Sequence, residues 1–148
     1  MKDLRAQQLH QWLAEIFNTD IPPLNSMNGD AGFRRYFRLQ INGKPYVAVD
    51  APSEKCNNQA FVDIALRLEH AGILVPEIIA KDLTRGFLCL SDLGDCLLAQ
   101  LLTDNSVQEY YRQAIALLPN VAKIATKNLP DCDRAFIRTE LTIFPEWL

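Results

Sequence analysis

Apolar residues near the amino terminus recur with the spacing of a helix. Positions i, i+3, i+4, i+7 and i+8 lie on one helical face, and here they are occupied by Leu9, Trp12, Leu13, Ile16 and Phe17. This pattern predicts a helix over about residues 3–18. The Ile-Pro-Pro run at 21–23 cannot continue a helix, so we expect extended chain after it.

The period changes to two between Phe33 and Ile41, as in a strand with one buried face. One face carries Arg35, Phe37, Leu39 and Ile41, and the other carries Arg34, Tyr36, Arg38 and Gln40. Asn42-Gly43 is a strong signal for a two-residue hairpin. We therefore expect residues 44–50 to return as the partner strand.

Residues 57–71 return to the helical period, with Gly72 placed to end the helix. Two further β-type runs follow at Val75–Ala80 and Gly86–Ser91, and Pro76 indicates that the first lies at a sheet edge or begins there. The sequence thus predicts an α+β fold. It consists of an antiparallel sheet of about five strands with one packed helix, preceded by the amino-terminal helix.

The chain becomes helical from Leu97 onward. Ser106 and Glu109 have the spacing of a capping box, which predicts a helix start at that place. Pro119 would remove a hydrogen bond from this helix, so we expect a kink or break near residue 118. A last short helix is expected over Cys132–Thr142.

Composition narrows the class of protein. The 148 residues are 49% hydrophobic, which fits a globular domain and excludes a disordered chain. The formal net charge of −3 argues against nucleic acid as a partner, and no apolar run is long enough to span a membrane. The four cysteines form no Cys-x-x-Cys pair, so we expect reduced thiols and a cytoplasmic protein.

The segment Gly29-Asp-Ala-Gly-Phe-Arg-Arg-Tyr-Phe-Arg38 is the strongest candidate for chemistry. Glycine leaves backbone N–H groups uncovered, and guanidinium groups bind phosphate oxygens in pairs. The same residues also suit an ordinary β-turn followed by a solvated strand, so the pattern alone leaves both interpretations open.

Three ordered motifs resemble the amino-terminal part of the aminoglycoside phosphotransferase family, which are kinase-like enzymes. They are the glycine segment, Tyr46-Val-Ala-Val-Asp-Ala-Pro52 and Leu88-Cys-Leu-Ser-Asp-Leu-Gly-Asp95. The combination is most similar to the bacterial branch that phosphorylates the cell-wall amino sugars N-acetylmuramate and N-acetylglucosamine. The resemblance implies a kinase-like amino-terminal lobe over residues 1–95, followed over 96–148 by the first helices of an incomplete carboxy-terminal lobe.

The resemblance also implies a role for each motif. The glycine loop, with Gly29, Asp30, Ala31 and Gly32, would cover the phosphates of ATP, which is bound with Mg²⁺ in the intact enzyme. The backbone around Ser91, Asp92 and Leu93 would hydrogen-bond the adenine edge at the hinge. Asp50 stands where many kinases carry a phosphate-binding lysine, and a carboxylate there is repulsive unless it binds Mg²⁺ or pairs with arginine. Arg34, Arg35 and Arg38 are the candidate replacement cations.

The catalytic residues of the resembled family lie in a carboxy-terminal lobe with a His-x-Asp loop, and no His-x-Asp occurs in these 148 residues. We therefore assign no catalytic or metal-binding residue here and expect no phosphoryl transfer by this stretch alone. The apolar Trp147-Leu148 end resembles an interruption. The alternative interpretation is a non-catalytic nucleotide-binding or protein-interaction module, which would dimerise through exposed apolar surface.

Overall fold

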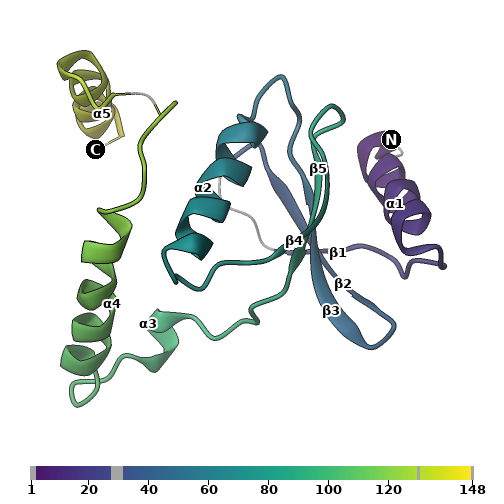
Figure 1. Cartoon of the computed structure of the whole chain (residues 1–148), viewed down its shortest axis with the longest axis horizontal. Coiled ribbons are helices and arrows are strands. Elements are labelled where there is room, and N and C mark those ends of the chain that lie inside the picture. The colour runs from purple at the N-terminus through teal and green to yellow at the C-terminus, as the bar shows by residue number, and fades with distance from the viewer. Residues whose placement is uncertain (1–2, 28–31, 130, 148) are drawn as a thin grey trace.

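The computed structural model describes residues 3–27, 32–129 and 131–147. Its centre is a five-stranded sheet of order β1-β2-β3-β5-β4, in which every neighbouring pair is antiparallel. The strands are β1 (Asn25–Ser26), β2 (Arg35–Ile41), β3 (Lys44–Asp50), β4 (Ile78–Asp82) and β5 (Phe87–Ser91). The predicted α+β class and antiparallel sheet are confirmed (Figure 1).

The predicted hairpin joins β2 to β3. Asn42 and Gly43 have φ angles of 51° and 75°, and Ile41 pairs directly with Lys44. Positive φ at both turn residues is what a two-residue hairpin needs, and Asn and Gly tolerate it best. This turn fixes the register of β2 on β3, and with it the face to which each side chain points.

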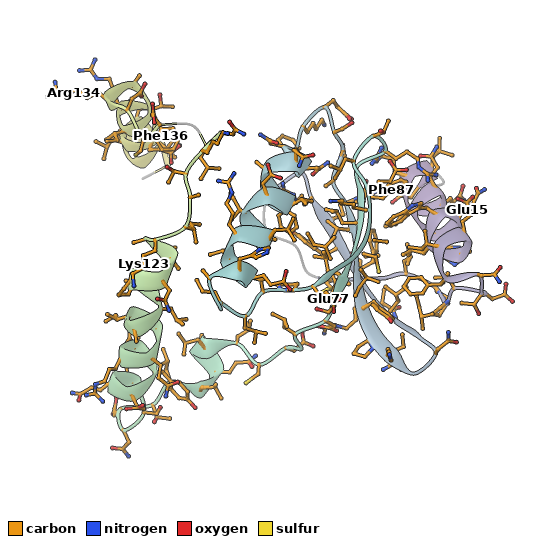
Figure 2. All side chains as sticks on the ribbon, in the orientation of Figure 1. Glu15, Glu77, Phe87, Lys123, Arg134 and Phe136 are labelled. Atoms are coloured by element: carbon orange, nitrogen blue, oxygen red, sulfur yellow. The ribbon has the colours of Figure 1, made fainter. Side chains whose placement is uncertain are left out.

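Helices cover both faces of the sheet (Figure 1). Helix α1 (Leu4–Phe17) buries Leu9, Trp12 and Leu13 against the alternating apolar residues of β2, which are Phe37, Leu39 and Ile41. Phe87, labelled in Figure 2, belongs to this cluster, and its ring centroid lies 5.8 Å from that of Trp12. We predicted one packed helix, but the structure has a second one, because the apolar face of α1 needs the sheet for burial.

Helix α2 (Asn58–His70) covers the opposite face of the sheet. Val62 is buried there with Val49, Ala51, Leu88 and Leu90. The Asn57 side chain accepts a hydrogen bond from the Ala60 N–H at the start of the helix. Gly72, with φ 74°, ends it as predicted, and the N–H groups of Gly72 and Ile73 donate back to Glu69 and Leu68.

The edge strand β4 begins later than predicted. The pattern indicated residues 75–80, whereas the strand spans Ile78–Asp82. Pro76 has no N–H to give to the ladder, so pairing starts beyond it and extends to Asp82 opposite Phe87. Its position at the sheet edge is confirmed.

The helices beyond the sheet are α3 (Leu98–Leu101), α4 (Val107–Val121) and α5 (Arg134–Trp147). The predicted capping box is wrong: the Ser106 hydroxyl donates to the Leu101 carbonyl and makes no cap. Of the predicted kink or break near residue 118, the break is wrong, since α4 continues through Pro119 to Val121. Only two residues of α4 follow Pro119, so the hydrogen bond that the proline removes lies in the last turn and displaces little of the helix.

The last two helices stand apart from the sheet, on the far side of α2 (Figure 1). The labelled Arg134 of α5 reaches outward in Figure 2, and Phe136 on the same helix is 54% exposed. One link to α2 is made by Arg67, whose guanidinium donates to the carbonyls of Ala125 and Lys127 at 2.6 and 2.8 Å. Within the described ranges, none of the helices is long and apolar enough to cross a membrane.

Candidate functional site

The glycine segment ahead of β2 is described only from Gly32 onward. The predicted phosphate-binding residues Gly29, Asp30 and Ala31 lie outside the described residues. Gly32 is exposed, and among the described residues other than its chain neighbours a Cβ added there would meet no atom within 4 Å. Packing against these described residues therefore does not explain the glycine at position 32.

A cavity of about 450 Å³ opens beside this segment. It lies between the start of β2 and the turn before α2, and is lined by Gly32, Phe33, Arg34, Tyr36, Lys55, Cys56 and Asn57. The Arg34 guanidinium lies 5.3 Å from the Phe61 ring centroid, and the Lys55 ammonium lies 4.9 Å from that of Phe33. The buried Arg34 Nε has no hydrogen-bond partner among the described residues.

The amino terminus of α2 adds a third positive element to the cavity. Asn57, the capping residue of this helix, is also a lining residue. The first turn of a helix carries partial positive charge from its unpaired N–H groups, and anions are stabilised there. The cavity, which we call the cationic pocket, thus brings together Arg34, Lys55 and a helix amino terminus.

Asp50 lies on the other side of the sheet, under α1. Its side chain has 0% exposure, and each carboxylate oxygen faces one arginine. Oδ1 accepts from Arg5 Nε and Nη2 at 2.8 and 2.5 Å, while Oδ2 accepts from Arg35 Nε and Nη2 at 2.9 and 2.5 Å. From the sequence we expected that a carboxylate at position 50 would need Mg²⁺ or an arginine partner, and Arg5 and Arg35 of the same chain are such partners.

Arg35 is shared between two carboxylates. Besides Asp50 it pairs with Asp3, the residue that caps α1. The hydrogen bond from Arg35 lowers the pKa of Asp3, and the Ala6 N–H adds to this. The Asp3 hydrogen bond raises the pKa of Arg35 in turn, so both stay charged. This network fastens α1 to β2 and β3, and we call it the α1 anchor: Asp3, Arg5, Arg35 and Asp50.

The third candidate cation, Arg38, reaches the segment that follows β5. Residues 91–95 form this hinge segment. Arg38 Nε lies 2.6 Å from Asp92 Oδ2, Nη2 donates to Asp92 Oδ1 at 3.0 Å, and Nη1 pairs with Asp95. Burial opposes ionisation of Asp92, but hydrogen bonds from Arg38 and the Gly94 N–H outweigh it and lower its pKa.

The other predicted hinge residues lie around this pair. Ser91 ends β5, and its N–H and Oγ bond the backbone of Glu77 at 2.9 Å each. The Leu93 side chain is 56% exposed. A second cavity of about 760 Å³ opens beside the hinge segment, and its lining includes Arg38, Asp92, Leu93 and Gly94.

The structure therefore divides the predicted site residues into three groups. Gly32 and Arg34 meet at the cationic pocket, Arg38 joins Ser91, Asp92 and Leu93 at the hinge segment, and Arg35 and Asp50 belong to the α1 anchor. Sequence reasoning missed Arg5 and Lys55. Arg5 precedes Leu9 by one helical turn on the buried face of α1, and a cation there signals an acidic partner in the sheet. Lys55 lies in an irregular turn and carries no such signal.

Comparison with known proteins finds N-acetylmuramate/N-acetylglucosamine kinases. The chain is 38% identical to the N-acetylmuramate/N-acetylglucosamine kinase of Pseudomonas aeruginosa, over 98% of this chain and 46% of that protein. The Pseudomonas putida kinase of the same name is 37% identical over the same shares. That of Neisseria meningitidis is 28% identical, over 97% of this chain and 44% of that protein.

The chain thus spans about half the length of the curated relatives it matches. No family model matches it. No solved structure matches it either.

Proposed function

We propose that this chain is the nucleotide-binding portion of an ATP-dependent kinase that phosphorylates an amino sugar. The observation that carries the proposal is the 37–38% identity to amino-sugar kinases over 98% of the chain. In this proposal residues 1–95 form a kinase-like amino-terminal lobe, and residues 96–148 begin the carboxy-terminal lobe. The free thiols Cys56, Cys89, Cys96 and Cys132 fit a reducing, cytoplasmic setting.

The cationic pocket is our proposed site for the nucleotide phosphates. A buried guanidinium Nε without a partner is costly unless an acceptor is supplied, and phosphate oxygens are such acceptors. Gly29, Asp30, Ala31 and Gly32 would lie over the phosphates, with Arg34 and Lys55 opposing their charge. Arg34 here takes the role that a third-strand lysine has in many kinases, because the β3 side chains packed toward α2 are Val47 and Val49.

We leave Asp50 and Arg35 out of the proposed phosphate site. The carboxylate of Asp50 is fully buried and each of its oxygens accepts from an arginine, which leaves it poorly placed to bind a metal or a phosphate-bound water. Both residues lie on the α1 face, whereas Arg34 stacks on Phe61 of α2. Their role in the proposal is to hold the sheet that carries the pocket.

The adenine end of the nucleotide is proposed to lie at the hinge segment, against Ser91, Asp92 and Leu93. ATP bound with Mg²⁺ would supply the γ-phosphoryl group. Among the described residues no three His, Cys, Asp or Glu side chains are grouped to hold a metal, so we assign no magnesium ligand to this chain. Since His-x-Asp is absent from its 148 residues, we propose that transfer to the sugar requires residues beyond it.

Titration of the 148-residue chain with ATP tests the proposal. We expect a rise in unfolding temperature and saturable heat of binding, since a ligand of the folded state stabilises it. Arg34→Met should weaken ATP about tenfold, the size of one charge-assisted hydrogen bond. Arg112→Met is the matched control, because Arg112 is 71% exposed on α4 and pairs only locally with Glu109. No response to millimolar ATP would contradict the proposal.

A turnover assay tests the second part. The chain with ATP, Mg²⁺ and N-acetylmuramate should form no sugar phosphate above a heat-killed control. Product above that control would show that the transfer step needs nothing outside these residues.

A second candidate function, a non-catalytic interaction module, is favoured by the exposed apolar side chains of α4 and α5. Ile115, Leu118 and Leu141 are 59%, 59% and 67% exposed. Apolar surface of this kind promotes association. Analytical ultracentrifugation and the ATP titration together test it: a stable dimer with no ATP binding would favour this candidate, and a monomer that binds ATP would count against an interaction module.

A further inference from the structure

Arg38 was a candidate phosphate ligand, but its surroundings assign it elsewhere. It lies on β2 between Asn25 of β1 and Val47 of β3, on the same strand face as Arg34 and Tyr36. Its guanidinium turns toward the hinge segment, 54 residues farther along the chain, and meets both oxygens of Asp92. Arg38 is not among the residues that line the cationic pocket.

The contact is built on the side of the hinge segment as well. The Asp92 side chain is 6% exposed, so its charge depends on partners within the chain. One of its oxygens accepts from both Arg38 and the Gly94 N–H, the latter at 2.8 Å. Gly94 has a φ of 86°, a value that side chains disfavour. One carboxylate therefore fixes the turn at Gly94 and its attachment to β2.

Asp95 strengthens the attachment from the outside. Its carboxylate pairs with Arg38 Nη1 and is 76% exposed, so solvent screens it more than Asp92. Arg38 itself is 28% exposed. Nη1 and Nη2 thus bond a carboxylate each and Nε lies 2.6 Å from Asp92 Oδ2, so every nitrogen of the Arg38 guanidinium faces a carboxylate of the chain.

We propose that Arg38 is a positioning residue that holds the hinge segment in the shape that receives the adenine end of the nucleotide. This inference rests on the proposed function. A backbone edge that recognises a base must be held at fixed distance and angle, because small displacements remove hydrogen bonds. Arg38 of β2 holds the hinge segment in place through its contacts with Asp92. Its expected signature is an effect on nucleobase binding that is separate from phosphate binding.

The test separates the two ends of the ligand by titrating ATP, adenosine and inorganic tripolyphosphate. For the Arg38→Met chain we expect about tenfold weaker ATP and adenosine, the size of one charged hydrogen-bond pair, with tripolyphosphate unchanged. Arg34→Met is the matched variant and should do the reverse, weakening ATP and tripolyphosphate but not adenosine. Arg38→Lys, which keeps one ion pair with Asp92, should recover part of the adenosine affinity.

Asp92→Asn gives a second route that leaves every cation in place. It should weaken adenosine as Arg38→Met does, and the double variant should lose no more than either single variant, because one contact is removed twice. Amide hydrogen exchange in residues 91–95 of the ligand-free Arg38→Met chain should also rise. Thermal unfolding of each variant identifies any general loss of structure.

Several results would overturn the inference. If Arg38→Met weakens ATP and tripolyphosphate but leaves adenosine unchanged, Arg38 is a phosphate ligand. If additive losses are found for Arg38→Met and Asp92→Asn, the two residues do not act through one contact. Unchanged affinities in both variants would show that the attachment plays no part in binding. Failure of the unaltered chain to bind ATP and adenosine would overturn the proposed function and this inference together.

Discussion

The sheet region, residues 4–91, and the helical region, residues 98–147, have similar apolar patterns but opposite burial. Leu13 and Leu88 have 0% exposure in the sheet region, while Leu118 and Ile115 of α4 are each 59% exposed. Both buried clusters found among the described residues lie in the sheet region. An amphipathic pattern makes a helix, but a second apolar surface is needed to make a core.

The charged residues differ between the regions in the same way. In the sheet region arginines reach across the sequence, from Arg5 to Asp50 and from Arg38 to Asp92, 45 and 54 residues apart. In the helical region the ion pair described is Arg112 with Glu109, one turn away on the same helix. Long-range pairs add stability only where a fold already holds both partners, so they mark the part of the chain with tertiary structure of its own.

The sharpest way to break this comparison is to remove the same side chain from each region. Leu88→Ala should lower the free energy of unfolding by about 3–4 kcal/mol, because it leaves a cavity in a closed core. Leu118→Ala should change it by less than about 0.5 kcal/mol, since the side chain is already in solvent. Urea unfolding of both variants measures this. Similar losses in the two would mean that α4 is covered in solution.

The α1 anchor is the next test, since it fastens a helix to the sheet through a buried charge. Asp50→Asn should cost about 3 kcal/mol, because two arginines lose their shared carboxylate. We place it at the low end for a broken buried pair, since Arg5 and Arg35 keep 34% and 41% of their side chains exposed. Asp104→Asn, at an exposed position before α4, is the control. Equal urea midpoints for the two variants would argue against the anchor.

Much of the sheet region could be predicted because its signals are local. The Asn42-Gly43 hairpin, the cap at Gly72 and the alternation of β2 all follow from single residues or short periods, and the structure has each of them. The β4 start was missed because the ladder with β5 begins only at Ile78, beyond Pro76, which has no N–H to donate. The capping box at Ser106 failed because its Oγ already accepts from the Thr103 N–H and donates to the Leu101 carbonyl, a competition that spacing does not show.

The candidate site could be predicted only in part for a similar reason. The glycine segment and the family resemblance gave Arg34, Arg35 and Arg38 as candidate cations, and strand alternation separated Arg35 from the other two. It could not show that Arg35 turns to Asp50 while Arg38 turns to Asp92, because those partners come from other elements. Lys55 enters the cationic pocket through the geometry of a turn, which no pattern in the sequence indicates.

Acid should weaken the sheet region through its paired aspartates. A hydrogen bond from Arg35 is the main cause of the lowered pKa of Asp3, and one from the Arg85 backbone N–H is the main cause for Asp82. Burial opposes the ionisation of Asp92, but hydrogen bonds from Arg38 and the Gly94 N–H lower its pKa. Each therefore holds fewer protons when folded. Their stabilisation is complete above the unfolded pKa of about 3.9 and is lost as pH falls through the lower folded values. Urea midpoints should be flat from pH 6 to 5 and fall below about pH 4. Asp92→Asn should reduce the fall, and a midpoint that is unchanged at pH 3 would contradict these assignments.

The smallest effect is expected where the two regions touch. Arg67 of α2 donates to the carbonyls of Ala125 and Lys127, and these bonds are exposed. Arg67→Met should therefore change the free energy of unfolding by under about 1 kcal/mol, yet speed amide exchange around Leu129, whose N–H bonds the Thr126 carbonyl. Arg112→Met, within α4, should leave that exchange unchanged. If Arg67→Met also leaves it unchanged, this link does not hold the segment after α4. The helical region would then be ordered by its own short-range bonds, which would make the difference from the sheet region larger still.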